Sequence, residues 1–466
     1  MSRNNTSQYV LKKCEFDAVR QFPFGGKVDL KKFVGEITFY ESLLKPYLTC
    51  NIAMIDDKGY LTKRVRLQGS ETVEIEIDGT FEEEAKGTPI RLKLRVVKIV
   101  NQQKVNDKAT GYIIHCISES AFNDSFVKVS KSYHDNLEDI GEKILHRYLD
   151  VKVIKERPYW NSDEKSDQGP VKVVVPYLSP YHSLEWLMDR ATGPGGAPFF
   201  AFTSVWDTRP NRDNVRFGSF RTMVAEGIKK AAADLGIPKD RQTRTFYYNQ
   251  IAVNSQKAGS KYRRERGIIK SMKQNEIENT LRMVNLGAVG SQISNLDPFT
   301  SSKIGRHHNL VDYLEFLGNE AGTFSTIIDP IDEVKVEGVS RTLSEHNARQ
   351  KAQITSYGTY GWNNSYHDVR RPQALMNKTR KATVTALMYK NKIECVINGY
   401  SFATQQLRVG DVVNIIFDIQ DVEASRPEID KRRSGFYMIL EMSRSYIQNS
   451  HEVVVSVCKI ADHQIG

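Results

Sequence analysis

The chain has 466 residues, of which 40% are hydrophobic and 26% are charged. This apolar content excludes a wholly disordered protein, and at roughly 100–200 residues per domain the length predicts about three domains. No apolar run approaches the roughly 18–20 residues of a membrane helix, and no apolar segment follows Met1, so we expect neither a membrane anchor nor a secretory signal. The net charge of +10 is a mild excess, which permits a polyanion nearby but does not indicate that one is bound.

The cysteines are widely separated and contain no C-x-x-C pair. Cys116 and Cys458 lie in apolar runs, as buried free thiols do. We therefore expect no disulfide framework and no zinc site, and folding in a reducing cytosol. These predictions cover all five cysteines: Cys14, Cys50, Cys116, Cys395 and Cys458.

The first quarter has the period-two pattern of antiparallel strands. Apolar and polar residues alternate over 34–39, 48–54 and 73–77. Further strands are expected at 92–96 and 112–117. Strands this closely spaced, with no helices between them, favour a barrel or a sandwich.

Helical signals enter the second quarter. Asp135 or Asn136 can cap a helix with an apolar stripe that ends near Tyr148. Ser179 is expected to cap a second helix, with Pro180 at its first position, and an aromatic strand follows from Phe199. The segment 126–220 is therefore predicted to be α/β.

The pattern loosens from about Arg221 to Arg380, where we expect partly ordered insertions with long loops. The last quarter returns to β structure, and no residue-level repeat relates it to the first. Its predicted strands are 382–389, 394–398, 412–418, 436–441 and 452–459.

Motifs for catalysis or cofactor binding are absent from the sequence. There is no G-x-S-x-G, no Walker-type loop and no G-x-G-x-x-G. The pair His307-His308 is expected to be solvated in a basic loop, and His115 and Cys116 should face opposite sides of a strand. We expect no enzyme activity, no cofactor and no metal.

Two charged runs support alternative functions. Glu82 and Glu83 belong to an acidic run that would suit a tail-associated cell-wall hydrolase, although such a run is more often a solvated turn. A basic cluster could contact phosphate in a nucleic acid or form a protein–protein interface, and equally could be a solvated loop. Its candidate interface residues are Lys261, Arg263, Arg264 and Arg266.

Three parts of the chain together resemble a known family in their order and spacing. The first runs from Val34 through Pro46 to Asp56, and the second is the helix Ser183–Ala191 with the strand Pro198–Phe202. The third comprises 398–402, 407–415, 435–440 and 452–459. These stretches resemble the central hub protein of contractile-tailed, T-even-type phage baseplates, which is related to type VI spike hub regions and to phage late-control proteins.

The resemblance implies a β-rich α+β protein with two tail-tube-like antiparallel β-barrel domains. The first barrel would occupy residues 1–125 and the α/β middle domain 126–220. An insertion of mixed helices and long loops would cover 221–380. The second barrel would occupy 381–466, completed by strands from earlier in the chain.

The resemblance also implies a structural role. The chain would form a homotrimer that joins a six-fold tail tube, or its initiator protein, to a three-fold cell-puncturing spike. Baseplate wedge proteins would surround it, and the genome or a tape-measure protein would pass through its lumen. It would be located in the tail baseplate of a virion, or of a phage-derived injection particle, after assembly in the host cytoplasm.

Overall fold

The fold is described from a computed structural model of the chain. None of the described helices is both long enough and apolar enough to cross a bilayer. The structure describes residues 9–18, 26–57, 59–61, 67, 69–79, 89–104, 109–163, 165–166, 169–208, 212–237, 242–248, 267–274, 281, 284–285, 287, 289–297, 301–310, 312–313, 333–336, 338–342, 345–346, 349–354, 372–390, 392–419, 428–447 and 450–462.

The first quarter folds into a set of antiparallel strands that we call the first β module. Alternating residues such as Val73, Ile75 and Ile77 are buried, which confirms the period-two pattern. In space the strands follow the order β3-β4-β7-β6-β5-β1-β2. They are β1 (Tyr9–Ala18), β2 (Gly26–Asp29), β3 (Val34–Ser42), β4 (Thr49–Asp56), β5 (Thr72–Gly79), β6 (Ile90–Lys104) and β7 (Thr110–Ser118), with the short 3-10 helix η1 (Lys31–Phe33) before β3.

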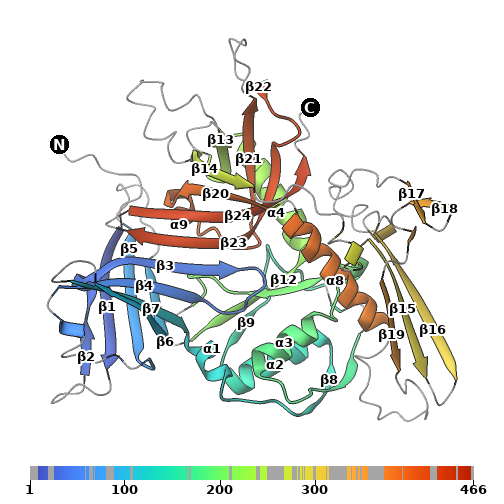
Figure 1. The fold of residues 1–466 in the computed structure, drawn as a ribbon, viewed down its shortest axis with the longest axis horizontal. Coiled ribbons are helices and arrows are strands. Elements are labelled where there is room, and N and C mark those ends of the chain that lie inside the picture. The colour runs from blue at the N-terminus through green and yellow to red at the C-terminus, as the bar shows by residue number, and fades with distance from the viewer. Residues whose placement is uncertain are drawn as a thin grey trace.

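The helices of the second quarter pack against a hydrophobic cluster of their own. Figure 1 shows these helices below the strands of the sheet. Asn136 and Ser179 occupy the expected N-cap positions, and Pro180 begins its helix. The elements are α1 (Glu119–Asp124), β8 (Ser132–Asp135), α2 (Leu137–Leu149), β9 (Lys152–Ile154), β10 (Val171–Val174), α3 (Pro180–Met188), η3 (Pro194–Gly196), β11 (Phe199–Phe202) and β12 (Asn214–Ser219).

Parts of the stretch 221–380 join the sheet and core of the last quarter. β13 pairs in parallel with β21 (Val412–Ile419), and β14 pairs with β20 (Lys392–Asn398). Three further strands form a small sheet at the end of the molecule opposite the first β module (Figure 1). The elements are α4 (Phe220–Leu235), β13 (Thr245–Tyr248), β14 (Ile269–Gln274), β15 (Gly290–Asp297), β16 (Ser302–Asn309), β17 (Glu333–Val336), β18 (Val339–Thr342) and β19 (Arg349–Ile354).

Helix α8 (Pro372–Lys390) replaces the strand that the sequence predicted at 382–389, and that prediction was wrong. Residues 382, 384, 386 and 388 alternate as in a strand, but Val384, Leu387 and Met388 also have helical spacing and are buried together. Ala, Leu and Met have high intrinsic helix propensity. Burial of side chains three and four positions apart against the core then stabilises the helix.

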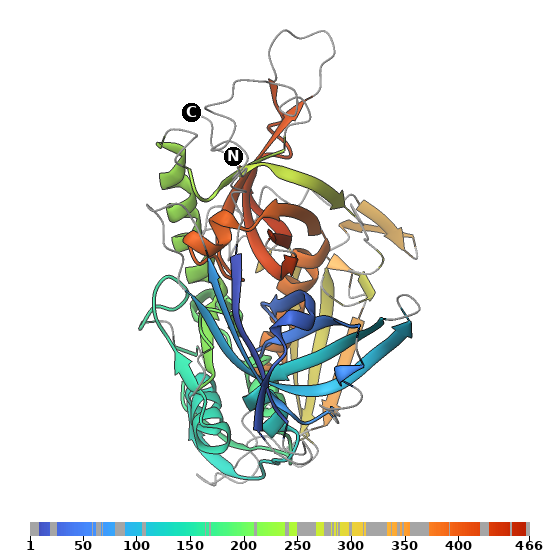
Figure 2. The ribbon, with the colours of Figure 1, turned by 90° about the vertical axis from the view of Figure 1, so that its left-hand side faces the viewer.

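The remaining strands of the last quarter agree with the sequence predictions. With β13 and β14 we call them the last β module. Its other elements are β20, α9 (Tyr400–Thr404), β21, β22 (Glu428–Ile429), β23 (Gly435–Ile447) and β24 (Ser450–Asp462). Figure 2 shows α4 lying along these strands.

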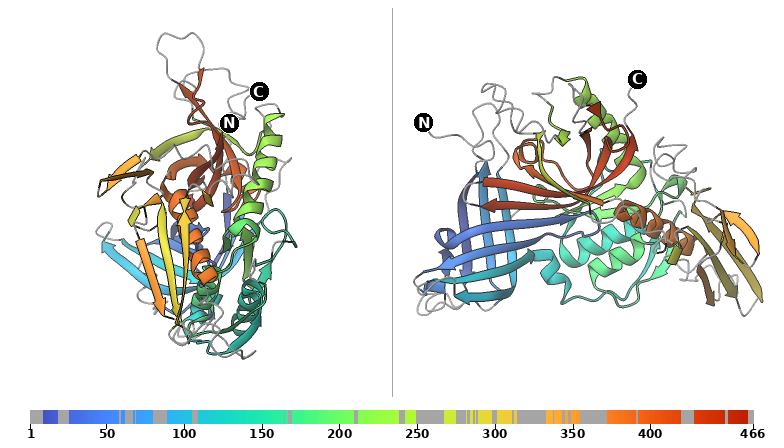
Figure 3. Two further views of the ribbon diagram at one scale, coloured as in Figure 1. Left: turned by 90° about the vertical axis from the view of Figure 1, so that its right-hand side faces the viewer. Right: turned by 45° about the horizontal axis from the view of Figure 1, so that its top comes forward.

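The two β modules are parts of one sheet. Long strand β23 pairs with β21 near its start and with β3 over Glu441–Ile447, so the path runs from β14 through β23 and β3 to β2. Figure 3 shows the strands of both modules side by side. The path forms one shared, β-rich and mostly antiparallel sheet, and in the last β module a bridge from Tyr247 to Ile268 links β13 back to the start of β14. The expected pair of tail-tube-like barrels stays a prediction. The residue boundaries predicted for the domains stay predictions.

Candidate functional site

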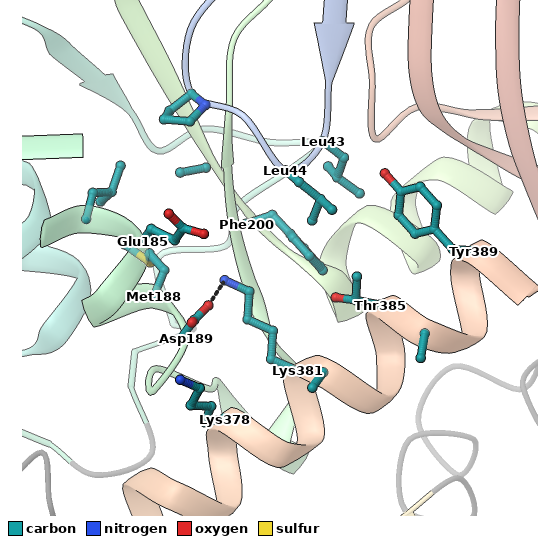
Figure 4. Close-up of a pocket in the computed structure, with 15 residues that line it drawn as sticks. Leu43, Leu44, Glu185, Met188, Asp189, Phe200, Lys378, Lys381, Thr385 and Tyr389 are labelled. Carbon is teal, nitrogen blue, oxygen red and sulfur yellow. Dashed lines mark ion pairs between the residues drawn. The ribbon is translucent and has the colours of Figure 1, made fainter. Parts of the chain in front are cut away.

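A groove lies where the first β module, the middle helices and α8 meet (Figure 4). Its volume is about 500 Å³, and its lining is mostly apolar. The turn after β3 contributes Leu44, which is 41% exposed at the rim. The lining residues are Leu43, Leu44, Pro46, Leu184, Glu185, Met188, Asp189, Phe200, Ala201, Lys378, Lys381, Ala382, Thr385, Ala386 and Tyr389.

Two helices form the long sides of this groove. In α3, Leu187 is buried in the hydrophobic cluster of the second quarter. Glu185, and Asp189 directly after the helix, border the groove. In α8, Val384 and Met388 turn into the core of the last β module. Each helix thus has one buried face and one face on the groove, because the 3.6-residue period separates them.

Phe200 on β11 lies at the base of the groove, and a charged pair crosses one end (Figure 4). Lys381 Nζ lies 3.2 Å from Asp189 Oδ1 and 5.6 Å from the centre of the Phe200 ring. This pair ties α8 to the end of α3. Among the described residues, Glu185 and Lys378 have no ion-pair partner in the groove, and the Glu185 carboxylate points into it.

A fully buried ion pair joins the two β modules. Arg444 Nε on β23 donates to Glu41 Oε1 on β3 at 2.9 Å, and both side chains have 0% exposure. Arg444 Nη2 donates to the Leu407 carbonyl, and the Val205 amide donates to Glu41 Oε1 at 3.2 Å. The pair therefore holds segments from four parts of the chain.

A second polar cluster joins the segment around β12 to the last β module. Asp207 Oδ1 accepts from Arg216 Nε at 2.8 Å, and Arg408 Nε lies 3.5 Å from Asp207 Oδ2. The Tyr159 hydroxyl donates to Asp411 Oδ1 at 2.8 Å. These contacts join the chain before β12 to the turn before β21.

Burial shifts the pKa values of the ionisable groups at and beside the Glu41–Arg444 pair. It raises the pKa of the Glu41 carboxyl, and the Arg444 guanidinium acts in the opposite direction. Burial, followed by the positive charge of Arg444, lowers the pKa of His451 well below its ordinary value. The His451 ring stacks on Tyr446 with centroids 4.3 Å apart. A neutral histidine is thus packed beside a charged pair.

Another hollow, of about 400 Å³, lies beside the end of β3. It is lined by residues of β3, β20, β23 and β24, among them Tyr40, Lys392, Glu394 and Glu441. Lys392 Nζ lies 2.6 Å from Glu441 Oε2, and the Tyr389 hydroxyl donates to Glu441 Oε1 at 3.1 Å. Lys392 and Glu441 are thus paired with each other, as Lys381 and Asp189 are in the groove.

The residues predicted as a basic interface lie outside the described part of the chain: Lys261, Arg263, Arg264 and Arg266. Glu82 and Glu83, on which the hydrolase alternative depends, also lie outside it. The basic interface and the hydrolase alternative both stay predictions.

The histidine predictions have mixed outcomes. His307 is exposed, but His308 is buried in β16 beside α8, with Nε2 3.1 Å from Thr383 Oγ1, so its expected solvation was wrong. The strand brings its ring against the core of the last β module. His115 and Cys116 face opposite sides as predicted, and all five cysteines are buried free thiols.

Sequence reasoning missed Glu41, Arg444 and the groove. Arg444 occupies an inward position between Met442 and Tyr446 in an alternating strand, and Glu41 does the same after Phe39. A charge at a core position of a strand was the available signal, since such charges require a partner. Across the described ranges no group of three metal-ligating side chains comes together. The groove itself can bind apolar and charged groups.

Comparisons with known proteins give only distant similarities. No protein-family model and no curated protein matches the chain. A tail protein of Neisseria meningitidis has 10% identity and a TM-score of 0.48, with 97% of each chain covered. A 43 kDa tail protein of the Shewanella oneidensis prophage MuSo2 has 9% identity and a TM-score of 0.47, covering 96% of this chain and 98% of that one.

A third solved structure is an Escherichia coli component of the type VI secretion system, itself described as similar to the bacteriophage T4 tail proteins gp27 and gp5. It has 7% identity and a TM-score of 0.41, covering 98% of this chain and 79% of that one. At TM-scores below 0.5, these similarities establish neither the function nor the partners of this chain.

Proposed function

We propose that this chain is the hub protein of a contractile-tail baseplate, where a trimer adapts a six-fold tube to a three-fold spike. The observation that carries the proposal is the joining of two β modules into one sheet through β23 and β3. The three stretches that resemble baseplate hubs lie in the first module, the middle domain and the last module. No catalytic role is part of the proposal.

Symmetry is the reason for such an arrangement. Two β modules in each of three chains provide six similar positions around an axis. One face can then meet six tube or initiator subunits, while the other keeps the three-fold symmetry of a spike. Wedge proteins would surround the ring, and the genome or tape-measure protein would pass through its lumen.

An adaptor of this kind must keep its two modules in fixed relative positions. The shared sheet and the buried Glu41–Arg444 pair both resist sliding between them. A one-residue slip of β23 against β3 would turn every inward side chain outward, so the register is strongly specified. The two modules therefore move as one body when a load is transmitted along the tail.

The mass of the purified full-length protein tests the proposal. Mass photometry should give a trimer, alone or after addition of a candidate spike protein. Electron microscopy of the particles should give rings with six similar lobes and an axial opening. A strictly monomeric chain, even with the spike protein present, would contradict the proposal.

A further inference from the structure

Within the part of the chain that the structure describes, one face of helix α8 lines the groove as a continuous seam. Its residues on the groove are spaced by three and four positions, as on a helix that packs against another helix. The seam consists of Lys378, Lys381, Ala382, Thr385, Ala386 and Tyr389. The opposite face of α8 is already buried in the core of the last β module, so the seam is a second packing face.

The lining of the groove suits a helix. Ala382, Thr385 and Ala386 are small and lie in the middle of the seam, where they allow a neighbour to approach closely. α3 forms the other long side, and Phe200 lies between the two at the base (Figure 4). A segment in an extended conformation gains its affinity from main-chain bonds to a strand edge, whereas both long sides here are helices.

The charges of the groove define the polar flanks of its occupant. Lys381 is already paired with Asp189 at one end. Glu185 on α3 and Lys378 on α8 lack ion-pair partners among the described residues and border opposite sides. Both residues are exposed at the rim of the groove, and an occupant that is basic toward α3 and acidic toward α8 would complement both charges and so gain specificity.

We propose that the groove binds one amphipathic α-helix of a partner protein. Its apolar stripe packs on Phe200 and Ala382, a Lys or Arg faces Glu185, and an Asp or Glu faces Lys378. This inference goes beyond the proposed hub function and does not depend on the number of copies in the ring.

Fluorescence anisotropy with designed peptides tests the inference on the full-length protein. The probe is a fluorescein-labelled peptide of about 18 residues, or five helical turns, with a Leu stripe flanked by Lys on one side and Glu on the other. A scrambled peptide of the same composition is the control. The patterned peptide should bind at least about tenfold more tightly, a difference of about 1.4 kcal/mol.

Variants of the groove locate the binding. Ala382→Trp fills the middle of the seam and should weaken binding of the patterned peptide by about tenfold or more. Ala232→Trp, on the exposed side of α4, is the matched control and should leave binding unchanged. Circular dichroism and the thermal midpoint verify that both variants fold.

A charge reversal tests the polar contact. Glu185→Lys should weaken binding of the patterned peptide, and a peptide with Glu on both flanks should bind this variant better than it binds the original protein. Equal binding of patterned and scrambled peptides, or tighter binding of a peptide with alternating Leu residues, would overturn the inference. If Ala382→Trp changed the oligomeric mass of the protein in the absence of peptide, a second copy would be the occupant of the groove. That result would also overturn the inference.

Discussion

Arg444 and Glu41 show how much of the architecture depends on single buried residues. Each is an ionisable side chain at a core position of its strand, 403 positions apart in the chain. Neither charge is tolerable there alone, because transfer of an unpaired charge out of water is very costly. Together they specify which strand of the last β module lies beside which strand of the first.

Removal of one partner should therefore destabilise the protein strongly. Arg444→Met leaves Glu41 buried without its counter-charge, and we expect a loss of about 3–5 kcal/mol in the free energy of unfolding. The double variant Glu41→Leu/Arg444→Met should lose less than Arg444→Met alone. Urea unfolding followed by tryptophan fluorescence measures both.

The exposed pair between Lys270 and Glu452 is the control for this experiment. Lys270→Met should cost less than about 1 kcal/mol, because surface ion pairs contribute little. If the double variant lost as much free energy of unfolding as Glu41→Leu and Arg444→Met lose in sum, the coupling that we infer from their contact would be contradicted.

His451 should make stability depend on pH. Its pKa is lowered in the folded protein, so below about pH 6.5 the unfolded chain binds a proton that the folded chain does not, and stability falls as the pH falls. The raised pKa of Glu41 has the opposite sign, because the folded chain then binds its proton first. A variant of His451 separates the two contributions.

His451→Phe retains a ring to stack on Tyr446 and removes the titrating group. Between pH 7.5 and 5.5, the original protein should lose about 1 kcal/mol more of its free energy of unfolding than this variant, the effect of roughly one proton over the unit below 6.5. Urea unfolding at the two pH values measures this difference. Equal losses would mean that the buried ring does not resist protonation.

At the scale of elements, α4 illustrates how a helix is fitted to a sheet. Gly227 faces β21, where an added Cβ would lie 2.3 Å from Val412 Cγ2. The absence of a side chain is therefore what allows the close approach of helix and strand. Alanine at this position gains helix propensity and loses packing, and the shortness of that distance makes the packing loss dominate.

Gly227→Ala should lower the free energy of unfolding by about 1–3 kcal/mol, since overpacking outweighs a propensity gain of about 1 kcal/mol. Val412→Ala in the same chain should restore part of the loss by making room for the added methyl. Thermal unfolding of the single and double variants measures the effect. If Gly227→Ala were stabilising, the helix would be free to move away from β21.

At the scale of the whole molecule, the pairing of β23 with β3 should make the two modules unfold together. Ser443 lies opposite Tyr40 in this pairing, and a proline there removes an amide and fixes its backbone angle. Ser443→Pro should replace one calorimetric transition by two at lower temperature. Glu428→Pro, at the start of the edge strand β22, should leave the transition single.

The sequence by itself determined the local elements and their environment. Alternation placed strands β3 to β7 of the first β module but not β1 and β2, Asn136 and Ser179 marked the helix starts, and isolated cysteines in apolar runs indicated buried thiols. Each of these signals is contained in a short window, because backbone period, capping and side-chain polarity act on near neighbours.

Only the tertiary structure decided how the elements combine. It made a helix of 372–390, where the sequence permitted two periods, and it buried His308 and Arg444 against partners far away in the chain. It also joined the two β modules into one sheet and left a groove beside α8. Strand partners and grooves depend on contacts between residues hundreds of positions apart, and a local pattern does not encode which distant face will meet it.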